Sequence, residues 1–193
     1  PPPPNPVFDF GSLAHALILG AGPEIEILDP AVHGLKADGT VADVPAMTGM
    51  WKKAAAAARA AGKLPVSTDD YAAALAMRDA VRAHPVAGAL FTSGVPEVSL
   101  YHRDPESGVR LRGRADWLTD DGSIVDLKTA KTANIAELGP HFWRYGYHQQ
   151  EAWYRGLVVA LGINPDPSFT FVVVDKTPPH PVVVVKWDDE AVA

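Results

Sequence analysis

Residues 114–128 read Arg-Ala-Asp-Trp-Leu-Thr-Asp-Asp-Gly-Ser-Ile-Val-Asp-Leu-Lys. The pattern predicts a strand that ends near Asp116 and a second strand over 123–128. Between them, the Asp-Asp-Gly of 120–122 is typical of a tight turn, because glycine and aspartate tolerate the backbone conformations that such turns need. The stretch therefore predicts a β-hairpin.

Two acids and one lysine give this hairpin its chemistry. Alternation along the second strand places Asp126 and Lys128 on one face and Leu127 on the other. Asp116 and Asp126 then approach each other from neighbouring strands, within reach of one divalent cation, and Mg²⁺ prefers carboxylate and carbonyl oxygens. A lysine beside such an ion orients a water or stabilises charge on a phosphoryl oxygen. The hairpin thus fits phosphodiester hydrolysis.

An ordinary surface hairpin is an alternative interpretation of the same residues, because Asp-x-Lys on a solvated face is common. The hydrophobic Ile124, Val125 and Leu127 indicate a mostly buried strand instead. Buried acids and lysines are rare unless they are paired or bind a metal. Burial therefore favours a functional site.

The composition describes a globular protein of 193 residues, 47% of them hydrophobic and 21% charged, in the usual range for a folded domain. No apolar run approaches the roughly 18–20 residues that a membrane span needs, so no membrane partner is expected. No signal peptide is recognised either. The absence of cysteine excludes disulfides, thiolate zinc sites and cysteine-ligated iron–sulfur clusters. We expect a cytoplasmic protein.

The two ends of the chain are interpreted as parts of something longer. The chain starts without Met at four prolines and stops in an apparent new helix at 188–193. Residues 1–8 are interpreted as a Pro-rich linker or N-terminal extension, and 9–193 as a single domain.

The net charge of −6 at first disfavours nucleic acid as a partner. Its distribution is uneven, since residues 110–155 carry seven Lys/Arg against six Asp/Glu. Bound metal would screen several of those acids. The charge therefore permits DNA binding.

Periodicity and end signals predict the other elements. Helices are expected at 11–19 with Asp9 as its cap, at 47–61, from the cap cluster 67–70 to 83, at 85–91, and as one long helix at 142–161. Strands are expected at 24–28, 95–102, 109–118, 123–129, 169–175 and 181–187, with a loop at 30–45. This order predicts an α/β fold with a mixed central β-sheet flanked by helices.

Further polar residues lie on the elements beside the hairpin. Glu97 lies on the preceding strand, opposite in face to Val98 and Leu100, so it is able to join the acidic cluster; an exposed acid on an edge strand is the alternative. Gln150 and Tyr154 are four residues apart and share a helix face. They are either part of the site or the polar edge of an amphipathic helix.

In combination these residues resemble the PD-(D/E)XK nuclease superfamily, in particular its RecB-like groups with a Q-x-x-x-Y helix. The motifs are Glu97, Gly-Arg-Ala-Asp-Trp at 113–117, Val-Asp-Leu-Lys-Thr at 125–129, and Gln-x-x-x-Tyr at 150–154. The segment 11–17, Gly-Ser-Leu-Ala-His-Ala-Leu, is similar to the helix of RecE-type (exonuclease VIII-like) phage and prophage exonucleases that carries a metal-site histidine. Residues 84–86 and 145–148 also look like that family, and the resemblance extends from about residue 10 to 187.

The resemblance implies a restriction-endonuclease-like core and a set of metal ligands. Asp116 and Asp126 would be the core ligands, with the backbone carbonyl of Leu127 beside them. Glu97 and His15 would complete the site, which would hold one or two Mg²⁺ or Mn²⁺ ions.

The remaining roles also follow from the resemblance. Lys128 would position the attacking water, and Gln150 and Tyr154 would support the site or touch the DNA backbone. The residues expected to contact DNA phosphates are Arg112, Arg114, Lys131 and Arg144. The proline of the family name is replaced by Ala115, a common departure that removes no required acid or lysine.

The activity that the resemblance implies is a divalent-metal-dependent exonuclease. It would act on double-stranded DNA ends, 5′→3′, in phage-type homologous recombination in the bacterial cytoplasm. Its expected partners are a RecT-like single-strand annealing protein and further copies of itself in a ring. Two alternatives stay open: a Cas4-like or helicase-associated nuclease without an iron–sulfur cluster, and a catalytically silent DNA-binding module.

Overall fold

The computed structural model describes residues 6–187, with side chains from residue 9 onward. It divides the chain into two compact units, Pro1–Arg78 and Asp79–Ala193, here called the N-terminal and the C-terminal unit. The single domain that the sequence predicts over 9–193 stays a prediction.

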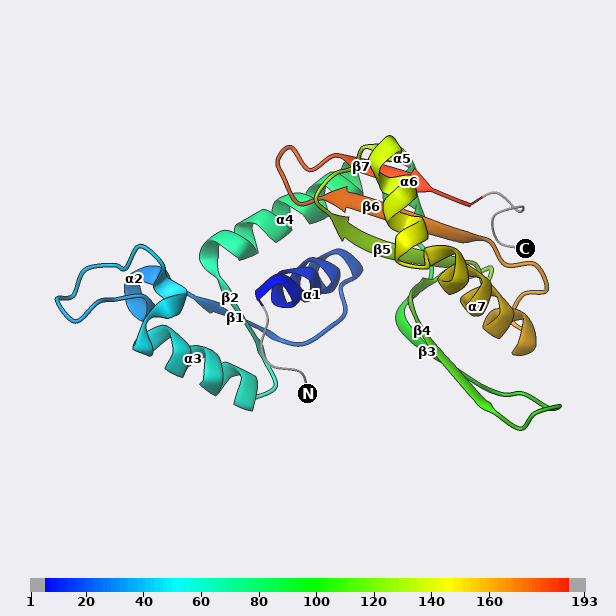
Figure 1. Ribbon diagram of the computed structural model, residues 1–193, viewed down its shortest axis with the longest axis horizontal. Helices are drawn as coiled ribbons and strands as arrows, with labels where there is room; N and C mark the ends of the chain where they lie inside the picture. The colour runs from blue at the N-terminus through cyan, green and yellow to red at the C-terminus, as the bar shows by residue number, and fades with distance from the viewer. Residues whose placement is uncertain (1–5, 188–193) are drawn as a thin grey trace. The chain divides into compact units, whose positions relative to one another are not determined.

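The N-terminal unit is built on a pair of parallel strands (Figure 1). Its elements are α1 (Pro6–Leu19), β1 (Ile25–Leu28), α2 (Pro30–His33), the 3₁₀-helix η1 (Pro45–Met47), α3 (Gly49–Ala60) and β2 (Leu64–Ser67). The strands pair from Ile25 opposite Leu64 to Leu28 opposite Ser67, and α2, η1 and α3 form the crossover that a parallel pair requires. The side chains buried at its centre are Leu13, Leu64, Val66 and Ala74.

The first helix begins earlier than predicted, at Pro6. Proline suits the first turn, because its ring fixes φ near the helical value and its missing N–H would have no acceptor there. Residues 6–8 are thus helical, whereas the predicted linker covered them; residues 1–5 lie outside the described part. The prediction of Asp9 as the cap was wrong: it lies inside α1, and its carboxylate pairs with Arg59 at 2.7 Å.

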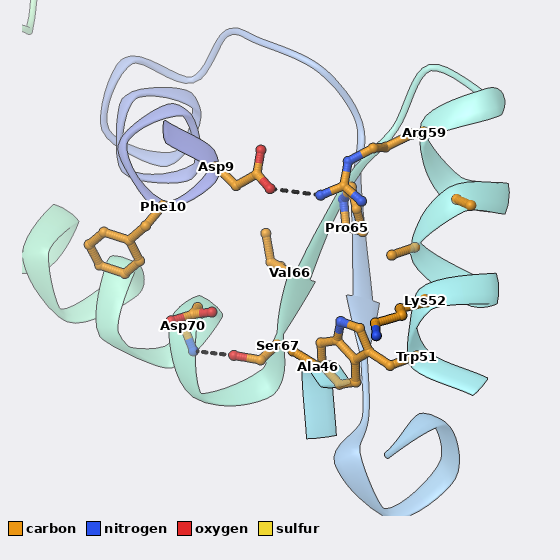
Figure 2. A pocket seen from close by; sticks show the side chains of 12 residues that line it. Asp9, Phe10, Ala46, Trp51, Lys52, Arg59, Pro65, Val66, Ser67 and Asp70 are labelled. Carbon is orange, nitrogen blue, oxygen red and sulfur yellow. Dashed lines mark hydrogen bonds and ion pairs between the residues drawn. The ribbon is translucent and has the colours of Figure 1, made fainter. Parts of the chain in front are cut away.

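That ion pair forms part of the wall of a pocket in the N-terminal unit (Figure 2). The pocket has a volume of about 670 Å³ and is lined from α1, α3 and β2. At its edge the hydroxyl of Ser67 accepts a hydrogen bond from the backbone N–H of Asp70, at 3.0 Å. The predicted cap cluster at 67–70 is therefore confirmed.

Two short elements of this unit were not predicted, β2 and α2. β2 is four residues long and contains Pro65, so it is too short for alternation to show and carries a residue that strands usually avoid. α2 is a single turn capped by Asp29, whose side chain accepts from Ala31 N. Both lie where the sequence reads as loop or as the start of the next helix.

The C-terminal unit contains the predicted sheet. α4 (Thr68–Ala83) crosses the boundary between the units. The elements that follow are α5 (Pro85–Leu90), β3 (Val95–Arg103), β4 (Arg110–Leu118), β5 (Ile124–Ala130), α6 (Ile135–Arg144), α7 (Tyr147–Ala160), β6 (Phe169–Asp175) and β7 (Val182–Val185). The predicted strands are confirmed to within two or three residues at each end.

The sheet has the strand order β3-β4-β5-β6-β7. The pairs are antiparallel except for β5 and β6, which run parallel. A parallel pair needs a crossover connection, and α6 and α7 supply it. β3 and β4 extend as a long hairpin beyond the rest of the sheet (Figure 1). The prediction of a mixed central sheet flanked by helices is confirmed.

The single long helix predicted over 142–161 was wrong, because the chain forms α6 and α7 with a break between them. Gly146 at the break has φ of 69°, in the left-handed region. Glycine occupies that region without steric cost, so the chain turns there and a new helix starts at Tyr147.

Aromatic packing fixes the two helices against the sheet. The ring of Phe142 in α6 meets Phe171 of β6 edge-on, with centroids 5.1 Å apart. Leu157 and Val158 of α7 are buried in the same cluster. α7 is thereby held close to β3 and β4, the strands that carry Glu97 and Asp116.

None of the helices between residues 6 and 187 has the length and apolar character that crossing a membrane requires. The helix predicted at 188–193 lies outside the described residues.

Candidate active site

The candidate site starts where β4 separates from β5. Within the part of the chain that the structure describes, these strands pair at Trp117 opposite Val125 and at Leu118 opposite Ile124. The next position along β4 is Asp116, whose carboxylate Oδ2 accepts a hydrogen bond from the backbone N–H of Leu127 at 2.9 Å. The aspartate side chain therefore accepts the hydrogen bond of a β5 N–H just beyond the last backbone pair of β4 and β5.

Glu97 lies on β3 beside Asp116. The registers on either side are Pro96 opposite Trp117 and Val98 opposite Ala115, and Glu97 between them has φ of 56°. Such a conformation is uncommon outside glycine and marks a local irregularity of the strand. It aims the acid at the start of the β4–β5 gap.

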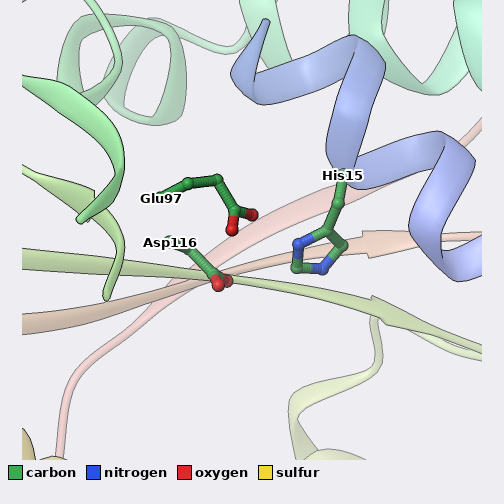
Figure 3. Close-up of side chains that lie close together, drawn as sticks. All are labelled: His15, Glu97 and Asp116. Carbon is green, nitrogen blue, oxygen red and sulfur yellow. The ribbon is translucent and has the colours of Figure 1, made fainter. Parts of the chain in front are cut away.

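The carboxylates of Glu97 and Asp116 point toward each other (Figure 3). A ligand oxygen of each lies within 4.8 Å of the other. Glu97 also forms an ion pair with the guanidinium of Arg114. The predicted approach of Glu97 to Asp116 is therefore present in the structure.

Asp126 and Lys128 share a face of β5, as alternation predicts. Asp126 is 4% exposed, and its Oδ2 pairs with Lys128 Nζ. A buried carboxylate is costly unless it is paired and hydrogen-bonded. The charge of Lys128 supplies the pairing.

Gln150 of α7 joins this pair to the helix. Its amide nitrogen donates to Asp126 Oδ1, and its amide oxygen accepts from Lys128 Nζ at 3.2 Å. The amide thus fixes both the acid and the amine at once. Of the two roles predicted for Gln150, support of the site agrees with these contacts.

Tyr154, one helical turn further, holds the backbone of β4. Its hydroxyl accepts from Arg114 N at 3.1 Å and donates to Arg114 O at 2.9 Å. The approach is close because residue 113 is glycine: a Cβ there would lie 2.8 Å from Leu157 Cδ1. The glycine of the 113–117 motif therefore has a packing role.

Tyr147 was not singled out from the sequence. Its ring lies under Lys128, with Nζ 4.7 Å from the ring centroid, a cation–π contact. Burial raises the pKa of the Tyr147 phenol, and the Asp126 carboxylate raises it further, while the Lys128 charge opposes the shift. The signal in the sequence was its position three residues before Gln150, which puts both on one helix face.

The other predicted residues lie as follows. His15 is half-buried on α1 of the N-terminal unit, and its role as a ligand stays a prediction. Arg112, Arg114, Lys131 and Arg144 all have exposed side chains in the C-terminal unit. Arg114 is engaged by Glu97. DNA contact by these four residues, and ligation by the Leu127 carbonyl, also stay predictions.

The acids fit a hard divalent cation. Ligand distances of about 2.0–2.6 Å let one ion join oxygens about 4–5 Å apart, and the carboxylates of Glu97 and Asp116 lie within 4.8 Å of each other. Asp126 faces Lys128 and Gln150 instead. To share an ion with Asp116, as predicted, Asp126 would have to exchange one of these partners for the cation.

Fold and site together define a class of protein. Its mixed sheet contains β4, which carries Asp116, and β5, which carries the Asp-x-Lys of 126–128, and the two strands separate beside these residues. The helix with the Gln-x-x-x-Tyr of 150–154 hydrogen-bonds to residues of both strands. The chain belongs to the family described as "PDDEXK-like domain of unknown function (DUF3799)", which matches residues 2–193.

Several solved chains are similar to this chain, and two of them are described here. One, from Eubacterium rectale and described as a "Putative exonuclease", has a TM-score of 0.53 and 15% identity, over 75% of this chain and 55% of that one. The chain thus spans just over half the length of that protein, and the likeness concerns the fold. The other, SSO0001, has a TM-score of 0.33 and 14% identity over 96% of this chain and 80% of that one, too weak to carry an argument. No curated protein matches. Family and fold support a nuclease.

Proposed function

We propose that the protein is a divalent-cation-dependent nuclease that hydrolyses phosphodiester bonds of DNA. The observation that carries the proposal is the position of Lys128. Its ammonium is fixed by the Asp126 carboxylate, the Gln150 amide and the Tyr147 ring, on the strand next to the Glu97–Asp116 pair. An amine held so firmly near a group of acids suits a role toward a phosphoryl oxygen.

Each residue has a task in this reaction. Glu97, Asp116 and Asp126 would hold the cation, which when bound lowers the pKa of a water and offsets charge on the phosphate. Lys128 would hydrogen-bond the attacking water or a phosphoryl oxygen, where its charge counts most in the transition state. Gln150 keeps the lysine and Asp126 aligned.

A gel assay on linear duplex DNA tests this function. The wild type should shorten the DNA with Mg²⁺ or Mn²⁺ and stop when chelator is added. Lys128→Ala should keep its fold and lose most of the activity, whereas Lys53→Ala, an exposed lysine of α3, should remain active. DNA that is shifted but never shortened would favour the catalytically silent module. Normal turnover of Lys128→Ala would remove the lysine from the mechanism.

The finer activity is an exonuclease that degrades linear duplex from its ends, 5′→3′, as proposed from the resemblance to RecE-type enzymes. Early release of a 5′-terminal label as mononucleotide would support this polarity, and release of a 3′-terminal label first would contradict it. A circular duplex should resist the enzyme.

The proposed assembly is a ring that encloses DNA, working with a RecT-like annealing protein. Enclosure would keep a protein of net charge −6 on a polyanion without bulk attraction. Light scattering at micromolar protein checks the ring, and a monomer mass with and without metal and DNA would exclude it.

A further inference from the structure

Aromatic residues cluster in the sequence where α6 ends and α7 begins, at the junction of the two helices in Figure 1. Trp143 is 61% exposed and Tyr145 is 60% exposed. Large aromatic rings contribute strongly to interfaces, and two so exposed within one turn of chain indicate a surface that meets a partner.

Both rings rest on a neighbouring ring. Trp143 stacks on His148 with centroids 4.3 Å apart and planes 12° from parallel. Tyr145 lies 4.4 Å from the ring of His141, tilted by 44°, and 6.1 Å from the ring of Tyr147, at 27°. The neighbouring rings limit the orientations of Trp143 and Tyr145, which both stay more than half exposed, so each side chain loses little conformational entropy on binding.

The stacked pair of tyrosines leads to the candidate active site. Tyr147, which supports Tyr145, also lies under Lys128, with Nζ 4.7 Å from its ring centroid. The Tyr145 ring is therefore no more than about 11 Å from Lys128 Nζ, the combined length of the two contacts. This upper bound corresponds to at most about three nucleotides at the roughly 3.4 Å rise of one strand in duplex DNA.

Charge near the rings favours a polyanion. Arg144 lies between the two rings in sequence and is exposed. Glu137 is the acid of α6, and it lies in the first turn, at the opposite end of the helix from Trp143. The C-terminal end of α6 thus combines the exposed rings of Trp143 and Tyr145 with the positive charge of Arg144. Proteins that bind single-stranded nucleic acid use this combination.

We infer that Trp143 and Tyr145 form a stacking surface for the unpaired bases of a DNA strand next to the candidate active site. The inference rests on the proposed nuclease function and adds the form of the substrate that the surface holds. Paired bases expose only their edges along a duplex, so the surface selects single-stranded DNA or the frayed end of a duplex.

The test is equilibrium binding of a fluorescently labelled oligo(dT) 20-mer, followed by anisotropy with chelator present so that no hydrolysis occurs. Tyr145→Leu removes the ring and keeps apolar volume, and Tyr145→Phe keeps the ring. Tyr101→Ala is the matched control, since Tyr101 of β3 is a tyrosine of the same unit that is 69% exposed. A blunt duplex of 20 base pairs is the second ligand.

We expect Tyr145→Leu to bind the single strand about tenfold more weakly than the wild type, the loss that one stacked base predicts. Trp143→Ala should show a loss of similar size. Tyr145→Phe and Tyr101→Ala should bind like the wild type, and binding of the blunt duplex should change less than that of the single strand.

Equal single-strand affinity of Tyr145→Leu and the wild type would overturn the inference, as would a wild type that does not bind the 20-mer. Loss of single-strand binding in Tyr145→Leu supports it even if the wild type never shortens DNA with Mg²⁺, a result that would defeat the nuclease function alone. Shortening of DNA by a Tyr145→Leu protein with full single-strand affinity would defeat the stacking surface alone.

Discussion

Replacing Tyr154 by phenylalanine removes a single oxygen atom that makes hydrogen bonds to both backbone groups of Arg114, at 3.1 Å to N and 2.9 Å to O. Arg114 lies opposite Ser99 of β3, and on its other side β4 has already separated from β5. The tyrosine hydroxyl thus supplies the hydrogen-bond partners of the Arg114 N–H and C=O that a neighbouring strand would otherwise supply.

The cost follows from these contacts. A typical hydrogen bond contributes about 0.5–1.5 kcal/mol net, and groups that water reaches lie at the lower end. Tyr154 is partly buried and the Arg114 side chain is exposed, so the loss should be about 1–2 kcal/mol in the free energy of unfolding. For a chain of 193 residues this corresponds to a fall of roughly 2–8 °C in Tm.

Thermal unfolding followed by circular dichroism measures the loss, with Tyr101→Phe as the control for removing an exposed hydroxyl. Hydrogen exchange supplies a local measurement, because the Arg114 amide should exchange faster in Tyr154→Phe. Nuclease activity should fall as well, since Asp116 lies two residues further along the loosened strand. An unchanged Tm together with unchanged protection of the Arg114 amide would refute the role of the hydroxyl.

Three further changes test other parts of the structure. Asp126→Ala should reduce Mn²⁺ affinity at least about tenfold, and calorimetry that finds equal affinity would remove Asp126 from the metal site. Glu97→Gly should be more stable than Glu97→Ala by about 1 kcal/mol in urea unfolding, because only glycine relieves the left-handed backbone; equal stability would mean that the conformation carries no strain. Asp121→Ala should lower the Tm at neutral pH, since hydrogen bonds from Thr119 first, and then from the backbone of the turn, hold the pKa of the Asp121 carboxyl below its ordinary 3.8. A carboxyl whose pKa is lower in the folded than in the unfolded state stabilises the protein at pH above the unfolded-state pKa. This stabilisation is lost as the pH falls through the folded-state pKa. The Tm values of Asp121→Ala and the wild type should therefore converge in acid, and a constant difference would contradict the assignment.

The sheet was predictable because its signals are local. Alternation and an Asp-Gly turn define β4 and β5 within a few residues, and β6 shows as a run of apolar residues at 169–174 with a single threonine, Thr170. The break at Gly146 was not predictable in this way, since a single glycine inside a helical pattern is compatible with a continuous helix. Its left-handed φ is a property of the folded backbone that the pattern of apolar residues does not show.

For the candidate site, the strand face of a residue was easier to predict than the direction of its side chain. Alternation placed Asp126 and Lys128 on one face correctly, because it depends on one strand alone. The direction of Asp116 toward the Leu127 N–H depends on where two strands separate, and the irregularity at Glu97 breaks the regular alternation on which the prediction rested. The contact of Tyr147 with Lys128 is tertiary: the helical spacing from Gln150 shows that the two residues share a helix face, but not that the Tyr147 ring meets the lysine.

The separation of β4 from β5 leaves a strand edge that another chain would be able to extend. α7 covers that edge. The indole N–H of Trp153 donates to the carbonyl of Arg112 at 3.1 Å, and the hydroxyl of Tyr154 hydrogen-bonds to the backbone N–H and C=O of Arg114. The two arginine side chains add charge, which discourages pairing between strand edges. Variants that loosen α7 should therefore show their defect first as aggregation through β4, before the sheet itself unfolds.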